Sequence, residues 1–234
     1  MVTNLLKFLS IVFLITLFLS AQNSYAQTTL ISPTGDGGFE NGASFTGNGW
    51  TDINHTTNTW QVGTVSVPYA GTNAAFVSND AGLTNAYTNS VLQTSHFYRD
   101  VTVPAGESKI VLTFQWKGNG ESGWDRLLIY TAPTSVTPAP GVPASNSTVL
   151  TGATLAYLQS TFPQATYGLQ TVNLPSSLAG TTFRLIFTWQ NDASGGTNPP
   201  VSIDNISLVS SLPVPLIAGN IYPINGTEAP PTSF

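Results

Sequence analysis

The chain contains 234 residues, of which 7% are charged, and its six Lys/Arg and eleven Asp/Glu give a net charge of −5. This balance disfavours a nucleic-acid partner, which requires a clustered basic surface. The absence of Cys excludes a disulfide scaffold, a thiol nucleophile and a thiolate zinc site. A hydrophobic content of 41% excludes a disordered chain and indicates one domain with flanking segments.

The first 26 residues have the three-part plan of a secretory signal peptide. Lys7 precedes an apolar run over residues 8–19, and Ser24 and Ala26 place small side chains before a cleavage point. The run would form about 18 Å of helix, which is too short for a hydrocarbon core of about 30 Å. We therefore expect a mature protein that begins at Gln27 and is secreted or held at the outer cell surface. A retained amino-terminal anchor helix is the alternative.

Two segments of the mature chain alternate apolar and polar side chains with the period of two that is typical of a half-buried strand. In residues 109–117, Leu112, Phe114 and Trp116 share one face, and residues 182–189 repeat the pattern. Further strands are expected over residues 60–67, 74–78, 97–103, 127–131, 167–174 and 201–209.

Clusters of Gly, Pro, Asn, Ser and Thr separate these strands, and no segment shows a sustained helical period. This pattern predicts an all-β fold, a jelly-roll β-sandwich of two antiparallel sheets over residues 27–211, preceded by the signal-peptide helix. The alternation slips at Asp204–Asn205, which predicts a bulge. Residues 118–123 match the spacing of a dinucleotide-binding loop, but a strand follows at residues 125–130 where that loop needs a helix. We therefore predict a hairpin turn there and no nucleotide site.

The sequence changes character after residue 211. Pro213 and Pro215 each remove a backbone donor, so a central strand cannot continue through them. Residues 212–234 are predicted to form a linker and the truncated start of a further β-sandwich module. The expected context is a larger surface protein in which neighbouring modules of the same polypeptide are partners.

Three groups of residues occur in a characteristic order: Gly38–Gly42 with Gly49–Thr51, Phe114–Glu121 with Asp125–Tyr130, and Ile203–Leu208. Taken together they resemble the MAM-like and cleaved-adhesin-like jelly rolls of secreted Bacteroidota surface proteins. The resemblance covers roughly residues 36–209. It implies a surface adhesion or interaction module, sometimes carbohydrate-binding and often holding a structural calcium ion. Vertebrate MAM domains carry disulfides, which this chain cannot form.

The resemblance also implies where calcium would bind. In the resembling folds, a Glu near the first strand and the Asp of the last strand share one ion, and these positions are Glu40 and Asp204 here. Asp36 is a third candidate ligand. Ca²⁺ takes six to eight oxygens, and an unpaired carboxylate among apolar strand residues would be unfavourable. The alternative is that Glu40 is a rim carboxylate and that Asp204 accepts hydrogen bonds from backbone donors at the bulge.

Candidate ligand-binding residues lie in one polar turn. Trp116 and Trp189 alternate with other apolar residues and are predicted to be in the core, whereas no such pattern places Trp124 there. An exposed Trp between acidic residues suits stacking on a sugar face, so Trp124, Glu121 and Asp125 are the predicted ligand-binding residues. The alternative is that Trp124 caps the end of the sandwich. Glu121 and Asp125 as a glycosidase pair are disfavoured, because the sequence indicates no cleft between them.

No catalytic set is expected. Ser95 and His96 are adjacent, so they would point to opposite faces of a strand and would not meet. Only two His are present, which disfavours a catalytic zinc site. The acidic loops at residues 79–82 and 191–195 are expected to be Asx turns closed by Gly, with a second cation site as the alternative.

The expected function is therefore that of a non-catalytic secreted adhesion or recognition module with a structural calcium ion. Its partner would be a glycan or a protein at the cell surface, and no membrane span is expected after removal of the signal peptide. The alternatives are a carbohydrate-binding module attached to a polysaccharide hydrolase and an architectural spacer domain.

Overall fold

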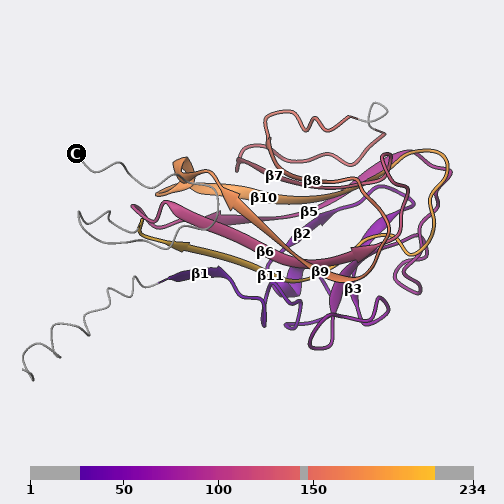
Figure 1. The fold of residues 1–234 in the computed structure, drawn as a ribbon, viewed down its shortest axis with the longest axis horizontal. Coiled ribbons are helices and arrows are strands. Elements are labelled where there is room, and N and C mark those ends of the chain that lie inside the picture. Colours follow the sequence, from indigo (N-terminus) through magenta and orange to yellow (C-terminus); the bar gives the residue numbers. More distant parts are fainter. Residues whose placement is uncertain (1–26, 143–146, 214–234) are drawn as a thin grey trace, which may run out of the picture.

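Two antiparallel β-sheets pack face to face in residues 27–142 and 147–213, the parts of the chain that the computed structural model describes (Figure 1). This all-β sandwich is the fold class that the alternating segments predict. The expected signal peptide and residues 214–234 of the expected linker and further module lie outside the described residues.

The larger sheet has six strands, and β11 is its hub. One edge of β11 pairs with β4 at Ser202–Ile203 and with β1 at Leu208–Ser210, while its other edge pairs with β6. The strands are β1 (Thr28–Ile31), β3 (Thr59–Gly63), β4 (Ala74–Ser78), β6 (Lys109–Gly118), β9 (Gln164–Leu174) and β11 (Ser202–Ser211), in the order β3-β4-β11-β6-β9 with β1 beside β11.

The smaller sheet has five strands and lies above the first in Figure 1. Its strands are β2 (Thr51–Ile53), β5 (Gln93–Thr102), β7 (Arg126–Pro133), β8 (Thr154–Gln159) and β10 (Thr182–Asn191), in the order β2-β5-β10-β7-β8. Two 3₁₀ helices, η1 (Thr46–Asn48) and η2 (Ser176–Leu178), lie in the connections. The described residues contain no helix that is long and apolar enough to cross a membrane.

An aromatic cluster fills the space between the sheets. Phe97 of β5 is fully buried and stacks on Phe187 of β10 at a ring-centroid distance of 4.9 Å. Trp50 and Trp60 approach Phe97 edge-on at 5.3 and 4.9 Å. Such contacts stabilise by about 0.5–1.5 kcal/mol each beyond burial. The cluster therefore ties both sheets together without a disulfide.

The strands with strict alternation agree with the sequence prediction. The inward residues Leu112, Phe114 and Trp116 of β6 are buried, and so is Trp189 of β10. The predicted bulge is confirmed, because the β11–β6 register shifts after Asp204. The following residue, Asn205, has a φ of 49° in the left-handed region.

The predicted hairpin at residues 118–123 is wrong. Strand β6 pairs with β9 and β11, whereas β7 pairs with β8 and β10, so the β6–β7 connection (119–125) crosses from one sheet to the other. A strand does follow the Gly-rich turn, as expected. The spacing of the glycines indicated a turn but carried no information about which sheet the next strand joins.

The β7–β8 connection (134–142 and 147–153) covers the outer face of the five-stranded sheet, on the side away from β6 and β11 (Figure 1). Tyr130 donates its hydroxyl to Thr148 O at 2.9 Å, and Arg184 donates to Val136 O at 2.8 Å. A second apolar cluster lies beneath the connection and includes Leu128, Tyr130, Ala132 and Ile186.

Candidate functional site

The loop between β3 and β4 (64–73, the 64–73 loop) is held by three charged side chains from distant parts of the sequence. Glu40 is the first. It follows the fully buried Phe39, and its carboxylate accepts hydrogen bonds from Thr72 N at 2.9 and 3.0 Å and from Asn73 N at 3.0 Å. Gly71 has a φ of 66°, and a Cβ there would collide with the Glu40 carboxylate. The loop therefore fits closely around this acid.

Asp204 is the second, and it is buried at the β11 bulge. Its Oδ2 accepts from Tyr69 N at 2.8 Å and from Ala70 N at 3.1 Å, and its Oδ1 accepts from Asn205 N at 2.7 Å. Burial raises the pKa of Asp204 to about 6; these three amides oppose the rise, and the negative charge of Glu40 adds to it. The structure thus brings Glu40 and Asp204 to the same loop, although 164 positions separate them.

Asp36, the third residue of the predicted calcium set, makes other contacts. Its carboxylate pairs with the Arg99 guanidinium and accepts from Ser32 N at 2.8 Å. Its backbone oxygen accepts from Trp50 Nε1 at 2.9 Å. Residues 27–142 and 147–213 contain no group of three or more His, Cys, Asp or Glu side chains placed to hold a metal ion. An ion between Glu40 and Asp204 would therefore need backbone oxygens as further ligands.

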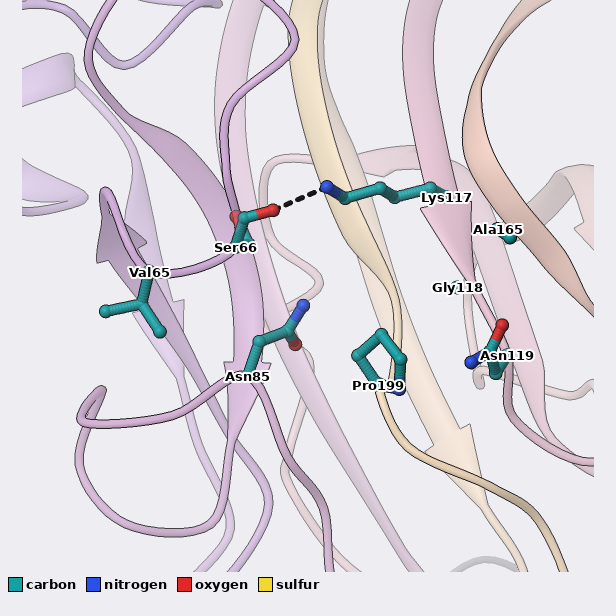
Figure 2. A pocket seen from close by; sticks show the side chains of 8 residues that line it. All are labelled: Val65, Ser66, Asn85, Lys117, Gly118, Asn119, Ala165 and Pro199. Carbon is teal, nitrogen blue, oxygen red and sulfur yellow. Dashed lines mark hydrogen bonds between the residues drawn. The ribbon is translucent and has the colours of Figure 1, made fainter.

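Lys117 is the third side chain that holds the 64–73 loop, and it does so from the outer face of the six-stranded sheet. Its Nζ donates to Ser66 O (Figure 2) and, at 3.0 Å, to Val67 O, and it lies 4.5 Å from the centre of the Tyr167 ring. Burial lowers the pKa of Lys117, and the charge of Asp204 opposes this. Two backbone carbonyls and an aromatic ring therefore hold the ammonium in place.

Two hollows adjoin on this outer face and share Lys117 and Ala165. The first has a volume of about 310 Å³ (Figure 2), and the second has about 360 Å³. The first is lined by Val65, Ser66, Asn85, Lys117, Gly118, Asn119, Ala165 and Pro199, and the second by Val67, Pro68, Tyr69, Lys117, Ala165, Thr166 and Tyr167.

The predicted ligand-binding residues lie in the β6–β7 connection, at the end of the sandwich. Trp124 is 43% exposed. Glu121 is partly buried, and its Oε2 is enclosed without a hydrogen-bond partner within the described chain. The turn that carries them is closed by Trp124 N, which donates to Glu121 O at 3.2 Å, and by Gly123 N, which donates to Ser160 O at 2.7 Å.

Asp125 points inward from the same connection. It is 1% exposed, and its Oδ2 accepts from the Tyr87 hydroxyl at 2.7 Å and from Glu121 N at 2.8 Å. Burial raises the pKa of Asp125 to about 6 against these hydrogen bonds, and the charge of Asp192 raises it further. In this position Asp125 fixes the turn, Trp124 faces the surface, and the Glu121 carboxylate packs against Gly195.

His96 and Ser95 point to opposite faces of β5, as their adjacency predicts. Ser95 donates to Asn58 O at 2.6 Å inside the sandwich, and His96 lies beneath the β7–β8 connection. Burial lowers the pKa of His96 to about 4, so the ring is neutral at pH 7. Its Nε2–H donates to Ala139 O at 3.2 Å, and its Nδ1 accepts from the Thr188 hydroxyl at 2.8 Å. Both nitrogens therefore have structural partners.

The two acidic loops form local turns. Asp80 accepts from Thr84 N at 2.9 Å and from the Thr84 hydroxyl at 2.6 Å, and Asp192 accepts from Ser194 N at 3.1 Å. The Asp192 contact is that of the expected Asx turn, whereas Asp80 accepts from a residue four positions further on and so closes a wider turn. These contacts give neither loop an outward set of carboxylates.

The residues of the two hollows were missed by sequence reasoning. Lys117 was predicted to face away from the core, but Tyr69, Asn85 and Tyr167 come from separate segments with no shared motif. Tyr167 lies on the outward face of β9, whereas Val172 of the same strand lies on the inward, buried face. This alternation was the one local signal in the sequence that pointed to a residue of the hollows.

No known protein family and no curated protein sequence matches the chain. Several solved structures have a similar backbone fold. The K1 cleaved adhesin domain of Lys-gingipain from Porphyromonas gingivalis W83 is 15% identical, with 81% of this chain and 99% of that chain covered and a TM-score of 0.47. The CBM22-1 xylan-binding domain of Paenibacillus barcinonensis Xyn10C is 12% identical, with 82% and 99% covered and a TM-score of 0.44.

An enzyme is also among the similar structures. The Stig cyclase Fisc from Fischerella sp. TAU is 12% identical to the chain, with 80% of this chain and 99% of that chain covered and a TM-score of 0.47. At these identities and TM-scores the likeness does not distinguish a binding module from an enzyme.

Proposed function

We propose that the protein is a secreted, non-catalytic recognition module that binds a glycan at the cell surface. The observation that carries this proposal is the exposure of Trp124. The other four Trp side chains are at most 3% exposed, whereas Trp124 is 43% exposed. No aromatic ring in the described part of the chain packs against it. An indole left in water suits stacking on the apolar face of a sugar ring.

The turn around Trp124 supports binding rather than catalysis. Asp125 is buried and bonded to Tyr87, so it does not share a cleft with Glu121 as a glycosidase pair would. Ser95 and His96 face opposite sides of β5. Recognition through Trp124 and Glu121 needs neither a base nor a nucleophile.

A glycan array tests this proposal. The purified chain is expected to bind at least one class of oligosaccharide, and Trp124→Ala is expected to weaken that binding about fivefold, because a stacked ring contributes about 1 kcal/mol. Leu158→Ala is the matched control, since Leu158 is 41% exposed on the edge strand β8. Glycan binding that is equally strong in Trp124→Ala and in the parent chain would remove Trp124 from the site.

A structural calcium ion between Glu40 and Asp204 is the second part of the proposal. Two carboxylates converge on the 64–73 loop, and in the described residues neither forms an ion pair with a basic side chain within 4.0 Å. Burial raises the pKa of Asp204 and the negative charge of Glu40 adds to the rise, and a divalent cation between the two carboxylates would stabilise their charged forms. Asp36 is paired with Arg99, so its assignment as a third ligand stays a prediction.

Thermal unfolding with and without calcium tests the ion. Extracellular calcium modules bind with a Kd on the order of 10⁻⁴ M, so about 10 mM Ca²⁺ should stabilise the fold by about 2.7 kcal/mol. For a domain of this size that corresponds to a rise in Tm of about 5–10 °C. Glu40→Gln keeps an oxygen for Thr72 N and Asn73 N but loses the charge, and it should abolish the rise. Superimposable melts in calcium and in chelator would refute the assignment.

The same binding site would serve an adhesin and a module attached to a polysaccharide hydrolase. We infer export from the amino-terminal signal sequence, and amino-terminal sequencing of protein from the culture medium should find Gln27 first. A chain that binds no glycan in the array would instead be an architectural spacer.

A further inference from the structure

The outer face of the six-stranded sheet carries a second candidate binding surface, away from the predicted residues of the β6–β7 turn. It consists of the two hollows that adjoin at Lys117, each within the volume range of small-molecule sites, about 300–1,000 Å³. One hollow contributes amide side chains and the other contributes aromatic rings. We call this surface the Lys117 groove, and its principal residues are Tyr69, Asn85, Lys117, Asn119 and Tyr167.

Tyr69 gives the groove a rigid aromatic wall. Its ring is 51% exposed and meets the Tyr167 ring edge-on at 5.7 Å. Its backbone is fixed by the hydrogen bond from Tyr69 N to Asp204, and Tyr167 is anchored through its hydroxyl to Ser202 Oγ at 2.8 Å. A ring that is already held in place loses little conformational freedom when a ligand stacks on it.

The amide hollow contains an acceptor that needs a donor. Asn85 Oδ1 is enclosed, and no donor within the described residues reaches it. The other end of this amide is placed to meet a ligand: in Figure 2 the Asn85 Nδ2 points toward Ser66 and Lys117 at the hollow, where it can donate to a ligand hydroxyl. Asn119 is oriented by its Nδ2, which donates to Asn198 O at 2.8 Å. In Figure 2 the amides of Asn85 and Asn119 lie on either side of Pro199.

The charge of the groove selects against an acidic ligand. The Lys117 ammonium donates to Ser66 O and Val67 O and faces the Tyr167 ring, so most of its hydrogen-bonding capacity is used within the protein. Asp204 lies close enough to act on Lys117 electrostatically, and the whole chain carries a net charge of −5. A neutral, hydroxyl-rich ligand fits these conditions.

We propose that the Lys117 groove binds a neutral glycan of at least two sugar units, with one unit stacked on Tyr69 and the next bonded to the amides of Asn85 and Asn119. This inference rests on the proposed function and names its substrate class and a binding face. A glycan that occupies both adjoining hollows must contain at least two sugar units. Lys117 positions the 64–73 loop that carries Tyr69.

The test uses the purified chain and two sets of probes. One contains neutral hexose and pentose oligomers of one to six units, and the other contains oligogalacturonate and heparin-derived oligomers. Tyr69→Ala and Asn85→Ala should each weaken binding of the neutral oligomers about tenfold in calorimetry, whereas Tyr69→Phe should bind as the parent does. Neutral dimers should bind at least tenfold more tightly than monomers. Leu158→Ala is again the control for an exposed side chain outside the groove.

Three outcomes overturn the inference while leaving the proposed function intact. They are glycan binding that Trp124→Ala abolishes and Tyr69→Ala leaves unchanged, a preference for the acidic oligomers, and equal affinity for monomers and dimers. If no probe binds the parent chain, the proposed function fails as well. Matched melting temperatures of the variants establish that they are folded. If Tyr69→Ala does not fold, the effect of Asn85→Ala on binding of the neutral oligomers tests the inference.

Discussion

Asp125 makes the stability of this protein depend on pH in an unusual direction. Its carboxyl is buried, and burial raises its pKa from 3.8 to about 6. Between pH 4 and pH 6 the folded chain therefore holds a proton on Asp125 that the unfolded chain has released. Because the folded state binds more protons, the free energy of unfolding falls as pH rises through this window. The slope is at most about 1.4 kcal/mol per pH unit, or about 3 kcal/mol in all.

The substitution Asp125→Asn isolates this contribution. The amide oxygen can take the place of Oδ2 and accept from Tyr87 and from Glu121 N, but the side chain no longer titrates. We expect the pH dependence between pH 4 and 6 to become shallower by up to about 1 kcal/mol per pH unit. Asp204 should keep the remaining slope in the same direction, because its pKa is also raised to about 6. Asp192→Asn should have an intermediate effect, since the charge of Asp192 raises the pKa of Asp125.

Urea denaturation at half-unit steps from pH 4 to pH 7, in metal-free buffer, measures these slopes. Each step yields a free energy of unfolding for the parent and for both variants. Parallel curves for the parent and Asp125→Asn would refute the argument. That result would mean that Asp125 titrates in the folded protein as it does in the unfolded chain.

Two further predictions concern the core and the 64–73 loop. Phe97→Ala should lower the free energy of unfolding by about 3–5 kcal/mol, because Phe97 is fully buried and contacts Trp50, Trp60 and Phe187. Phe97→Leu should lower it by less than half as much. Equal losses of the two variants in urea denaturation would contradict the described packing of the aromatic cluster. Gly71→Ala should be more destabilising than Gly123→Ala, although both glycines have a left-handed φ. The added Cβ would meet the Glu40 carboxylate at residue 71, whereas it would meet no atom at residue 123. Equal Tm values of the two variants in thermal melts would contradict the close fit of the loop around Glu40.

The fold was predictable where burial imposes a local pattern. Strands β6 and β10 have one or both faces in the interior, so their side chains had to alternate or to be continuously apolar. Strands β1, β2 and β8 were not predicted, and β1 has only four residues. β2 has only three residues, and β8 exposes Leu155 and Leu158 at the sheet edge, so neither has a clear buried face. The sheet that each strand joins is set by long-range pairing, which is why the turn after β6 was misjudged.

The candidate sites were predictable only in part, for the same reason. Glu40 and Asp204 were paired through a resemblance to whole folds, and the structure places both at the 64–73 loop. The placement of Asp36 beside Arg99 depends on β5 and could not be read locally. The Lys117 groove assembles side chains from four separate segments, and no spacing in the sequence links them.

The β7–β8 connection gives the sandwich two unlike sides. On the five-stranded side, backbone oxygens of this connection at Val136, Ala139 and Thr148 accept hydrogen bonds from the strands, so much of that face is covered by the chain itself. The outer face of the six-stranded sheet carries the Lys117 groove instead. Contact between an adjoining module and the covered five-stranded side would leave the Lys117 groove accessible to a ligand.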